Sequence, residues 1–149
     1  MNAETEVAYL AGFFDGEGCV TVHRRQDKAG HRLRTFATLI QATQKGRYFA
    51  VLERFQSRWG GSFKYDRRAD VVQWQCTTAA AGRALREMLP YLMVKREKAE
   101  IVLAMQNLKA TRGNRWVTVA EAAYEEEVAR RLKEITARDS KVPVNPLHR

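Results

Sequence analysis

One acidic residue stands where it could do chemistry. Glu17 lies between Gly16 and Gly18, at the end of the run Leu10-Ala11-Gly12-Phe13-Phe14-Asp15-Gly16-Glu17-Gly18. Because glycine commonly ends helices, the two glycines predict a helix that stops here with a carboxylate at its base. A carboxylate is an oxygen ligand for hard cations. Taken singly, these features fit equally well a buried helix with a glycine cap and a surface glutamate.

The helix that presents Glu17 has two apolar stripes, where a surface helix needs only one. Thr5 is placed to cap its N-terminus. The first stripe comprises Val7, Leu10 and Phe14. The second comprises Tyr9, Gly12, Phe13 and Gly16. We expect one stripe to pack on the helix's own domain and the other on a second surface. Close approach of a second backbone would offset the cost of Gly12, about 1 kcal/mol relative to alanine.

The whole nine-residue run resembles the signature of the LAGLIDADG homing endonucleases. It has the acid at the eighth position, glycine at the third and ninth, and apolar residues at the first, fourth and fifth. Only one copy of the motif is present in the chain.

Composition favours a polyanionic partner. The 149 residues carry 26 lysines and arginines against 17 acids, a net charge of +9, and 45% of them are hydrophobic. The length and hydrophobic content suit one domain with a single core, and the positive net charge suits a nucleic-acid partner. With no membrane-spanning run and no signal peptide, we expect a cytoplasmic or organelle-matrix protein that is not secreted. Cys19 and Cys76 are expected to be buried free thiols.

After Gly18 the pattern changes from helical to alternating, which predicts strands at 19–27 and 32–41 with a break at 43–46. A helix then ends at Gly60-Gly61, and a second hairpin spans 62–66 and 71–76, with Phe63 and Tyr65 facing the core. Helices are expected at 79–89, from 94 onward, and from the capping box at Thr118 to about 137. This order predicts an α+β fold: a four-stranded antiparallel sheet with helices on one face and additional C-terminal helices. Residues 1–138 would form one domain and 139–149 a flexible tail.

The other face of the predicted sheet is polar and basic. It mixes Arg, His, Gln, Asp and Thr, side chains that can read base edges or contact phosphates. Strand alternation assigns the candidates, so a slip of one residue would turn a whole strand over. They are Thr21, His23, Arg25, Asp27, Arg32, Thr35, Gln41, Lys64, Asp66, Arg68, Gln73 and Gln75.

The family resemblance, which extends to about residue 110, implies more than a fold. It implies an αββαββα saddle whose open face lies in the DNA major groove. A chain with one motif would be a homodimer, with Tyr9, Gly12, Phe13 and Gly16 at the interface. Glu17 and the Gly16 carbonyl would hold Mg²⁺, a site that Mn²⁺ or Ca²⁺ could also occupy. Gln44 would order the attacking water and Lys95 would stabilise charge at the phosphate, with Arg47 a weaker candidate.

The function implied is a metal-dependent, intron-encoded endonuclease that cuts both strands of a long, roughly palindromic DNA site. An alternative on the same fold is a non-cleaving binder, either a maturase acting on the host intron RNA or a DNA-binding regulator. A third interpretation, a generic basic α+β interaction domain, requires the motif to be a coincidence.

Overall fold

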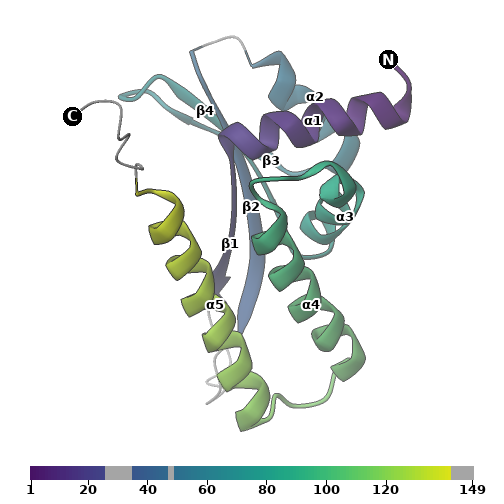
Figure 1. Ribbon diagram of the computed structural model, residues 1–149, viewed down its shortest axis with the longest axis vertical. Helices are drawn as coiled ribbons and strands as arrows, with labels where there is room; N and C mark the ends of the chain where they lie inside the picture. The colour runs from purple at the N-terminus through teal and green to yellow at the C-terminus, as the bar shows by residue number, and fades with distance from the viewer. Residues whose placement is uncertain (26–34, 47–48, 142–149) are drawn as a thin grey trace, which may run out of the picture.

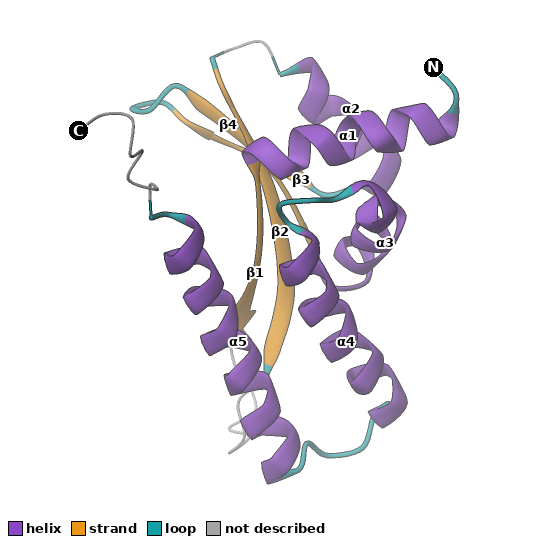
Figure 2. Cartoon of the chain, in the orientation of Figure 1, coloured by secondary structure: helices purple, strands orange, loops and turns teal. Residues whose placement is uncertain are grey.

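The centre of the molecule is a four-stranded antiparallel sheet in the order β1-β2-β4-β3 (Figures 1 and 2). The computed structural model describes residues 1–25, 35–46 and 49–141. The elements follow the chain as α1 (Ala3–Glu17), β1 (Gly18–Arg24), β2 (Phe36–Lys45), α2 (Ala50–Trp59), β3 (Ser62–Asp66), β4 (Val71–Thr77), α3 (Thr78–Met88), the short 3₁₀ helix η1 (Leu89–Tyr91), α4 (Arg96–Arg112) and α5 (Val119–Asp139). The predicted α+β class and order of elements are confirmed.

The helices cover one face of the sheet, and Figure 1 shows α1, α4 and α5 in front of the strands. The first apolar stripe of α1 lies in this core, since Val7, Leu10 and Phe14 are all buried. The ring of Phe55 in α2 packs against that of Trp74 in β4 at a tilt of 41°, with 4.8 Å between the ring centroids. Burial of these large side chains supplies most of the driving force for folding.

The two ends of α1 are defined by local contacts. Asn2, rather than Thr5, is the N-terminal cap: its side-chain oxygen accepts a hydrogen bond from the Thr5 amide at 2.8 Å. At the other end Gly18 allows a close approach, because a Cβ there would lie 2.3 Å from the Phe14 carbonyl oxygen. Any larger residue at Gly18 would therefore separate α1 from β1.

The long strand β2 differs from its prediction. Residues 43–45, expected to break the chain, are its last three residues, and they pair with β4 in the register Thr43↔Gln73 to Lys45↔Val71. The backbone of this segment gains ladder partners that lie about 28 residues away in sequence, which a local pattern does not reveal. The first strand ends at Arg24, and the expected strand residues 26–27 and 32–34 lie outside the described part.

One burial prediction is wrong. Cys19 is exposed, because it alternates onto the open face of the sheet opposite Gln41, whereas Cys76 is buried as expected. Desolvation accordingly raises the pKa of the Cys76 thiol. Tyr65 shares the core side with its partner Val72 but stays 47% exposed, since β3 is the edge strand of the sheet.

The last helix is attached to the sheet through a buried carboxylate. Glu125 of α5, 1% exposed, accepts hydrogen bonds from the Phe36 amide at 3.0 Å and the Lys109 ammonium at 2.8 Å. The Arg112 guanidinium lies 3.6 Å from its second oxygen. Lys109 also donates to the Phe36 carbonyl. One ion-pair cluster therefore joins α5, α4 and the free edge of β2. Among the described helices, none is both long and apolar enough to cross a membrane.

Candidate functional site

Glu17 is the last residue of α1, and its carboxylate is exposed. Within the described residues it makes no hydrogen bond or ion pair. The last turn of α1 contains no basic residue. A helix C-terminus carries partial negative charge, so a carboxylate there is unfavourable unless a cation is nearby. The final carbonyls of a helix also lack intrahelical partners. The residues present therefore fit a hard divalent cation held by Glu17 and the Gly16 carbonyl.

Asp15, two residues earlier, links this helix end to α4. Its carboxylate accepts hydrogen bonds from the Met93 amide at 2.8 Å and from the Lys95 amide at 2.9 Å. Lys95 is the N-cap residue of α4 and has no side-chain cap of its own. Asp15 of α1 thus caps the N-terminus of α4. The helix α4 begins at Arg96, whereas the sequence predicted a start at residue 94. The same two bonds hold the half-buried Lys95 beside the end of α1.

The sequence argument did not single out Asp15. Its place inside the motif is a signal that some constraint applies there, but the two amides it binds are 78 and 80 residues away. No spacing rule connects positions that are so far apart in the chain.

Gln44 approaches the same point from the sheet. Gly18 pairs with Ala42 across β1 and β2, so Gln44 lies two residues past the place where α1 joins β1. By strand alternation, Gln44 lies on the same side of the sheet as Ala42, which is the side that faces the helices. Its side-chain carbonyl oxygen is buried and has no hydrogen-bond partner in the described structure. The structure thus places the backbones of Lys95 and Gln44 near the end of α1, where Glu17 lies. Arg47 lies outside the described residues.

A single chain offers few metal ligands. The described residues contain no group of three or more His, Cys, Asp or Glu side chains that could hold an ion. Any metal at Glu17 would therefore need ligands from outside this chain, such as a second copy, water or phosphate oxygens.

The open face of the sheet is as polar as its alternation predicts. Cross-strand pairs place Cys19, Gln41, Gln75 and Ser62 in one row. Gln41 donates to the side-chain oxygen of Gln73 at 3.0 Å. The strand candidates that share this face are Thr21, His23, Gln41, Lys64, Asp66, Gln73 and Gln75.

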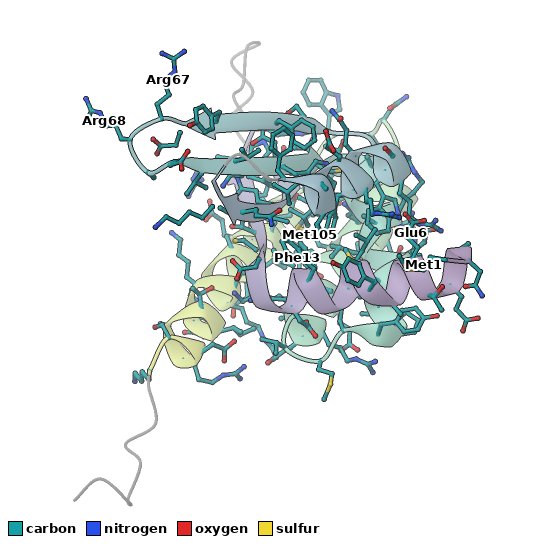
Figure 3. All side chains as sticks on the ribbon, turned by 90° about the horizontal axis from the view of Figure 1, so that it is seen from above. Met1, Glu6, Phe13, Arg67, Arg68 and Met105 are labelled. Carbon is teal, nitrogen blue, oxygen red and sulfur yellow. The ribbon has the colours of Figure 1, made fainter. Side chains whose placement is uncertain are left out.

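The remaining DNA-contact candidates that the structure describes, Arg25, Thr35 and Arg68, lie at the ends of the face. Thr35 accepts a backbone bond from Arg25 at 2.9 Å beyond the ends of β1 and β2. Arg68 is in the turn between β3 and β4, and Figure 3 shows Arg67 and Arg68 projecting away from the body of the molecule. Asp66 accepts from the amides of Arg68 and Ala69 at 2.9 and 3.2 Å, so its carboxylate is engaged in the turn. Asp27 and Arg32 lie outside the described residues.

The second stripe of α1 is not covered by its own chain. Tyr9 is 50% exposed, and Gly12 and Gly16 are exposed. A Cβ atom at either glycine would meet nothing within 4 Å. Phe13 alone turns inward (Figure 3), with its ring 6.0 Å from that of Phe55. Nothing within the described chain therefore requires glycine at these two positions.

Comparison with known proteins identifies the class. The model of the family described as LAGLIDADG endonuclease matches residues 10–102, which begin at the first residue of the motif. The chain belongs to the LAGLIDADG homing endonuclease family.

Particular relatives agree with this. The DNA endonuclease I-CvuI of Chlorella vulgaris is 30% identical over 108 residues, which are 69% of this chain and 65% of that protein. The match thus spans about two thirds of the relative's length. The crystal structure of I-CvuI with its target in the presence of 2 mM Ca has a TM-score of 0.74 at 21% identity, covering 95% of this chain and 87% of that one. The archaeal intron-encoded I-Vdi141I complexed with DNA also gives 0.74, at 15% identity over 99% and 93% of the two chains.

These structural alignments show a shared fold, and they cover more of the chain than the sequence resemblance does. The sequence resemblance ended near residue 110, whereas the fold likeness extends over 95% or more of the chain and so takes in most of α5. The last helix is therefore part of the common architecture, which the sequence did not indicate.

Proposed function

We propose that this protein is a homing endonuclease that cuts both strands of a long, roughly palindromic DNA site as a metal-dependent homodimer. The observation that carries the proposal is the motif that ends in Glu17, with the backbones of Lys95 and Gln44 close to the end of α1 and a polar open sheet beside them. The related structures of I-CvuI and I-Vdi141I contain bound DNA. An origin within an intron accords with the intron-encoded relative.

A homodimer supplies what one chain lacks. The chain has one motif and hence one Glu17. Pairing two copies of α1 about a twofold axis through Gly12 and Gly16 would bring two such carboxylates together. The backbones could approach closely because neither glycine has a side chain, and Tyr9 would be covered. The same pairing accounts for two glycines that the isolated chain does not need.

The site is suited to phosphodiester hydrolysis with Mg²⁺. Glu17 and the Gly16 carbonyl would hold the ion, which when bound neutralises charge on the phosphate and acidifies a coordinated water. Ca²⁺ and Mg²⁺ were present in the I-CvuI crystal structures with DNA. Gln44, whose side-chain carbonyl oxygen has no partner among the described residues, would turn toward the site to accept a hydrogen bond from the attacking water. Lys95, held by Asp15, places a positive charge near the developing negative charge of the phosphate.

The open sheet would read the target. Its glutamines and Thr21 are matched to base edges of the major groove, while Lys64, Arg25 and Arg68 suit phosphates. Each protomer would contact one half-site, so the target repeats with the symmetry of the dimer. Contacts spread over many base pairs make each single mismatch cost roughly 1–3 kcal/mol.

A plasmid library with random inserts tests the activity. Incubated with the protein and Mg²⁺, it should yield specific linear products that can be sequenced. Glu17→Gln should bind the selected site and leave it uncut, while the control Glu53→Gln, at an exposed position on α2, should cut normally. Cutting by Glu17→Gln would overturn the metal site. Binding without any cutting by the wild type would favour a non-cleaving regulator or an intron RNA maturase instead.

The interface has its own test. Gly12→Leu fits the folded chain, since no atom lies within 4 Å of the added Cβ, but it would separate two paired α1 helices. Sedimentation velocity should show a dimer for the wild type and a folded monomer for Gly12→Leu. The matched control Ala104→Leu, at an exposed position on α4, should remain dimeric. A dimeric Gly12→Leu variant would place the interface elsewhere.

A further inference from the structure

A cavity of about 310 Å³ opens beside the part of β2 that β4 does not reach. The pairing of the two strands ends at Leu39↔Thr77, after which the chain turns into α3. The edge of β2 at residues 36–38 therefore faces α3 and α4 instead of another strand. The described residues that line the cavity include three basic side chains and no carboxylate. This composition favours an anionic ligand.

A buried hydroxyl lines this cavity without a partner. Thr38 is 1% exposed, and its hydroxyl oxygen makes no hydrogen bond to any described residue. Buried polar side chains are nearly always hydrogen-bonded, so an unbonded one indicates a missing ligand or water. The hydroxyl can donate to an oxygen atom placed in the cavity.

The N-terminus of α3 meets the same space. Thr78 and Ala79 line the cavity and are the first two residues of this 11-residue helix. The N-cap residue Thr77 makes no side-chain capping bond, and the first turn contains no acid. Gln106 of α4 donates to the Thr78 carbonyl at 3.0 Å and holds the turn in place. The amides and dipole at this helix end therefore remain available to an anion.

Two guanidinium groups complete the possible anion-binding groups of the cavity. Arg25, the residue after β1, and Arg86 on α3 both line the cavity, and in the described structure neither side chain forms an ion pair or hydrogen bond. The third basic residue, Lys109, is already bonded to Glu125 and to the Phe36 carbonyl. Arginine suits phosphate because its planar donors match two phosphate oxygens at once.

We infer that this cavity binds a phosphate group, and that its occupant is a backbone phosphodiester of the DNA lying on the open sheet. Arg25 and Ala37 alternate onto that face, where Ala37 pairs with His23, so the cavity is continuous with the far end of the proposed DNA surface. A strand of DNA crossing this end would place a phosphate between Arg25, Arg86 and the Thr38 hydroxyl. The inference rests on the proposed DNA binding but uses a site separate from the cleavage centre.

The salt dependence of DNA binding tests the inference, because phosphate contacts do not depend on sequence. The probe is a mixed-sequence duplex, and the variants are Thr38→Val and Arg86→Gln. Arg83→Gln, on the same helix but outside the cavity lining, is the charge-matched control. Losing one phosphate contact should lower the slope of log affinity against log salt by about 0.9 for each protomer bound. Arg86→Gln should show this loss, Thr38→Val should bind more weakly than the wild type, and Arg83→Gln should keep the wild-type slope.

A second measurement separates DNA phosphate from free phosphate. Inorganic phosphate is titrated at constant ionic strength while the amide NMR signals of Thr38 and Thr78 are followed. A reduced duplex slope in Arg86→Gln, with or without a shift by inorganic phosphate, supports the DNA assignment. A phosphate-induced shift with an unchanged slope would overturn it in favour of a free-phosphate site. Wild-type duplex binding with unchanged affinity and slope in every variant, and no shift, would refute the cavity site and leave the proposed function standing. Failure of the wild type to bind duplex would refute both.

Discussion

The contact between Asp15 and the start of α4 leads to a prediction that separates positioning from direct catalysis. Asp15→Ala removes the acceptor for the Met93 and Lys95 amides, which lie 2.8 and 2.9 Å from its carboxylate. Both bonds involve a charged acceptor at a helix N-terminus, where the helix dipole also favours negative charge. Loss of a cap of this kind, in a half-buried position, should lower the free energy of unfolding by about 1–3 kcal/mol.

The same substitution should slow cutting more than the stability loss explains. Lys95 would no longer be held by its backbone amide. A displacement of about 1 Å in a catalytic group costs on the order of 100-fold in rate. Asp15→Asn keeps one acceptor oxygen and the side-chain volume, so it should lose less on both measures. Urea unfolding of the metal-free protein gives the stability, and single-turnover cutting of the selected site gives the rate.

A double-mutant cycle between Asp15→Ala and Lys95→Ala decides how Asp15 acts. If Asp15 works through Lys95, adding Asp15→Ala to Lys95→Ala should slow cutting little further. Rate losses that multiply independently would show that Asp15 has a role of its own at the phosphate. An unchanged free energy of unfolding in Asp15→Ala would refute the capping argument altogether.

Two further predictions concern buried charges. Glu125→Gln should lower the free energy of unfolding by roughly 3–5 kcal/mol, because it leaves Lys109 and Arg112 without their buried partner. The control Glu126→Gln, which loses only an exposed ion pair with Arg24, should cost at most about 1 kcal/mol in the same denaturant titration. Burial lowers the pKa of Lys98, which is 6% exposed and donates to the Thr136 hydroxyl at 2.7 Å. Between the lowered folded pKa and the higher unfolded one, the unfolded chain binds more protons, so the Lys98 contribution to stability grows with pH. Lys98→Met should be more stable than the wild type near neutral pH and lose this rise in alkaline solution; equal stability curves for the two proteins would contradict the argument.

The sequence predicted the elements whose signals are local. The buried stripe of Val7, Leu10 and Phe14 follows from helical spacing, and the polar open face follows from strand alternation. The prediction was wrong for Cys19 because its apolar neighbours suggested burial, although its position in the alternation places it on the open face. It was wrong for residues 43–45 because their partners lie in β4.

The candidate site divides in the same way. Glu17 could be found from its glycine neighbours and the motif, since both are contiguous in the chain. The role of Asp15 could not, because it depends on amides about 80 residues away. The cavity at Thr38 could not be predicted either, since its lining comes from β2, α3, α4 and the residue after β1.

The sequence by itself determined the family, the α+β order and the carboxylate at the end of α1, because each depends on residues that are close together in the chain. Only the tertiary structure decided what surrounds that carboxylate. It placed the backbones of Lys95 and Gln44 near the end of α1, left Gly12 and Gly16 uncovered, and buried Thr38 without a partner among the described residues. These outcomes depend on long-range packing and strand register, in which distant segments compete for the same neighbours, and local periodicity carries no information about that competition.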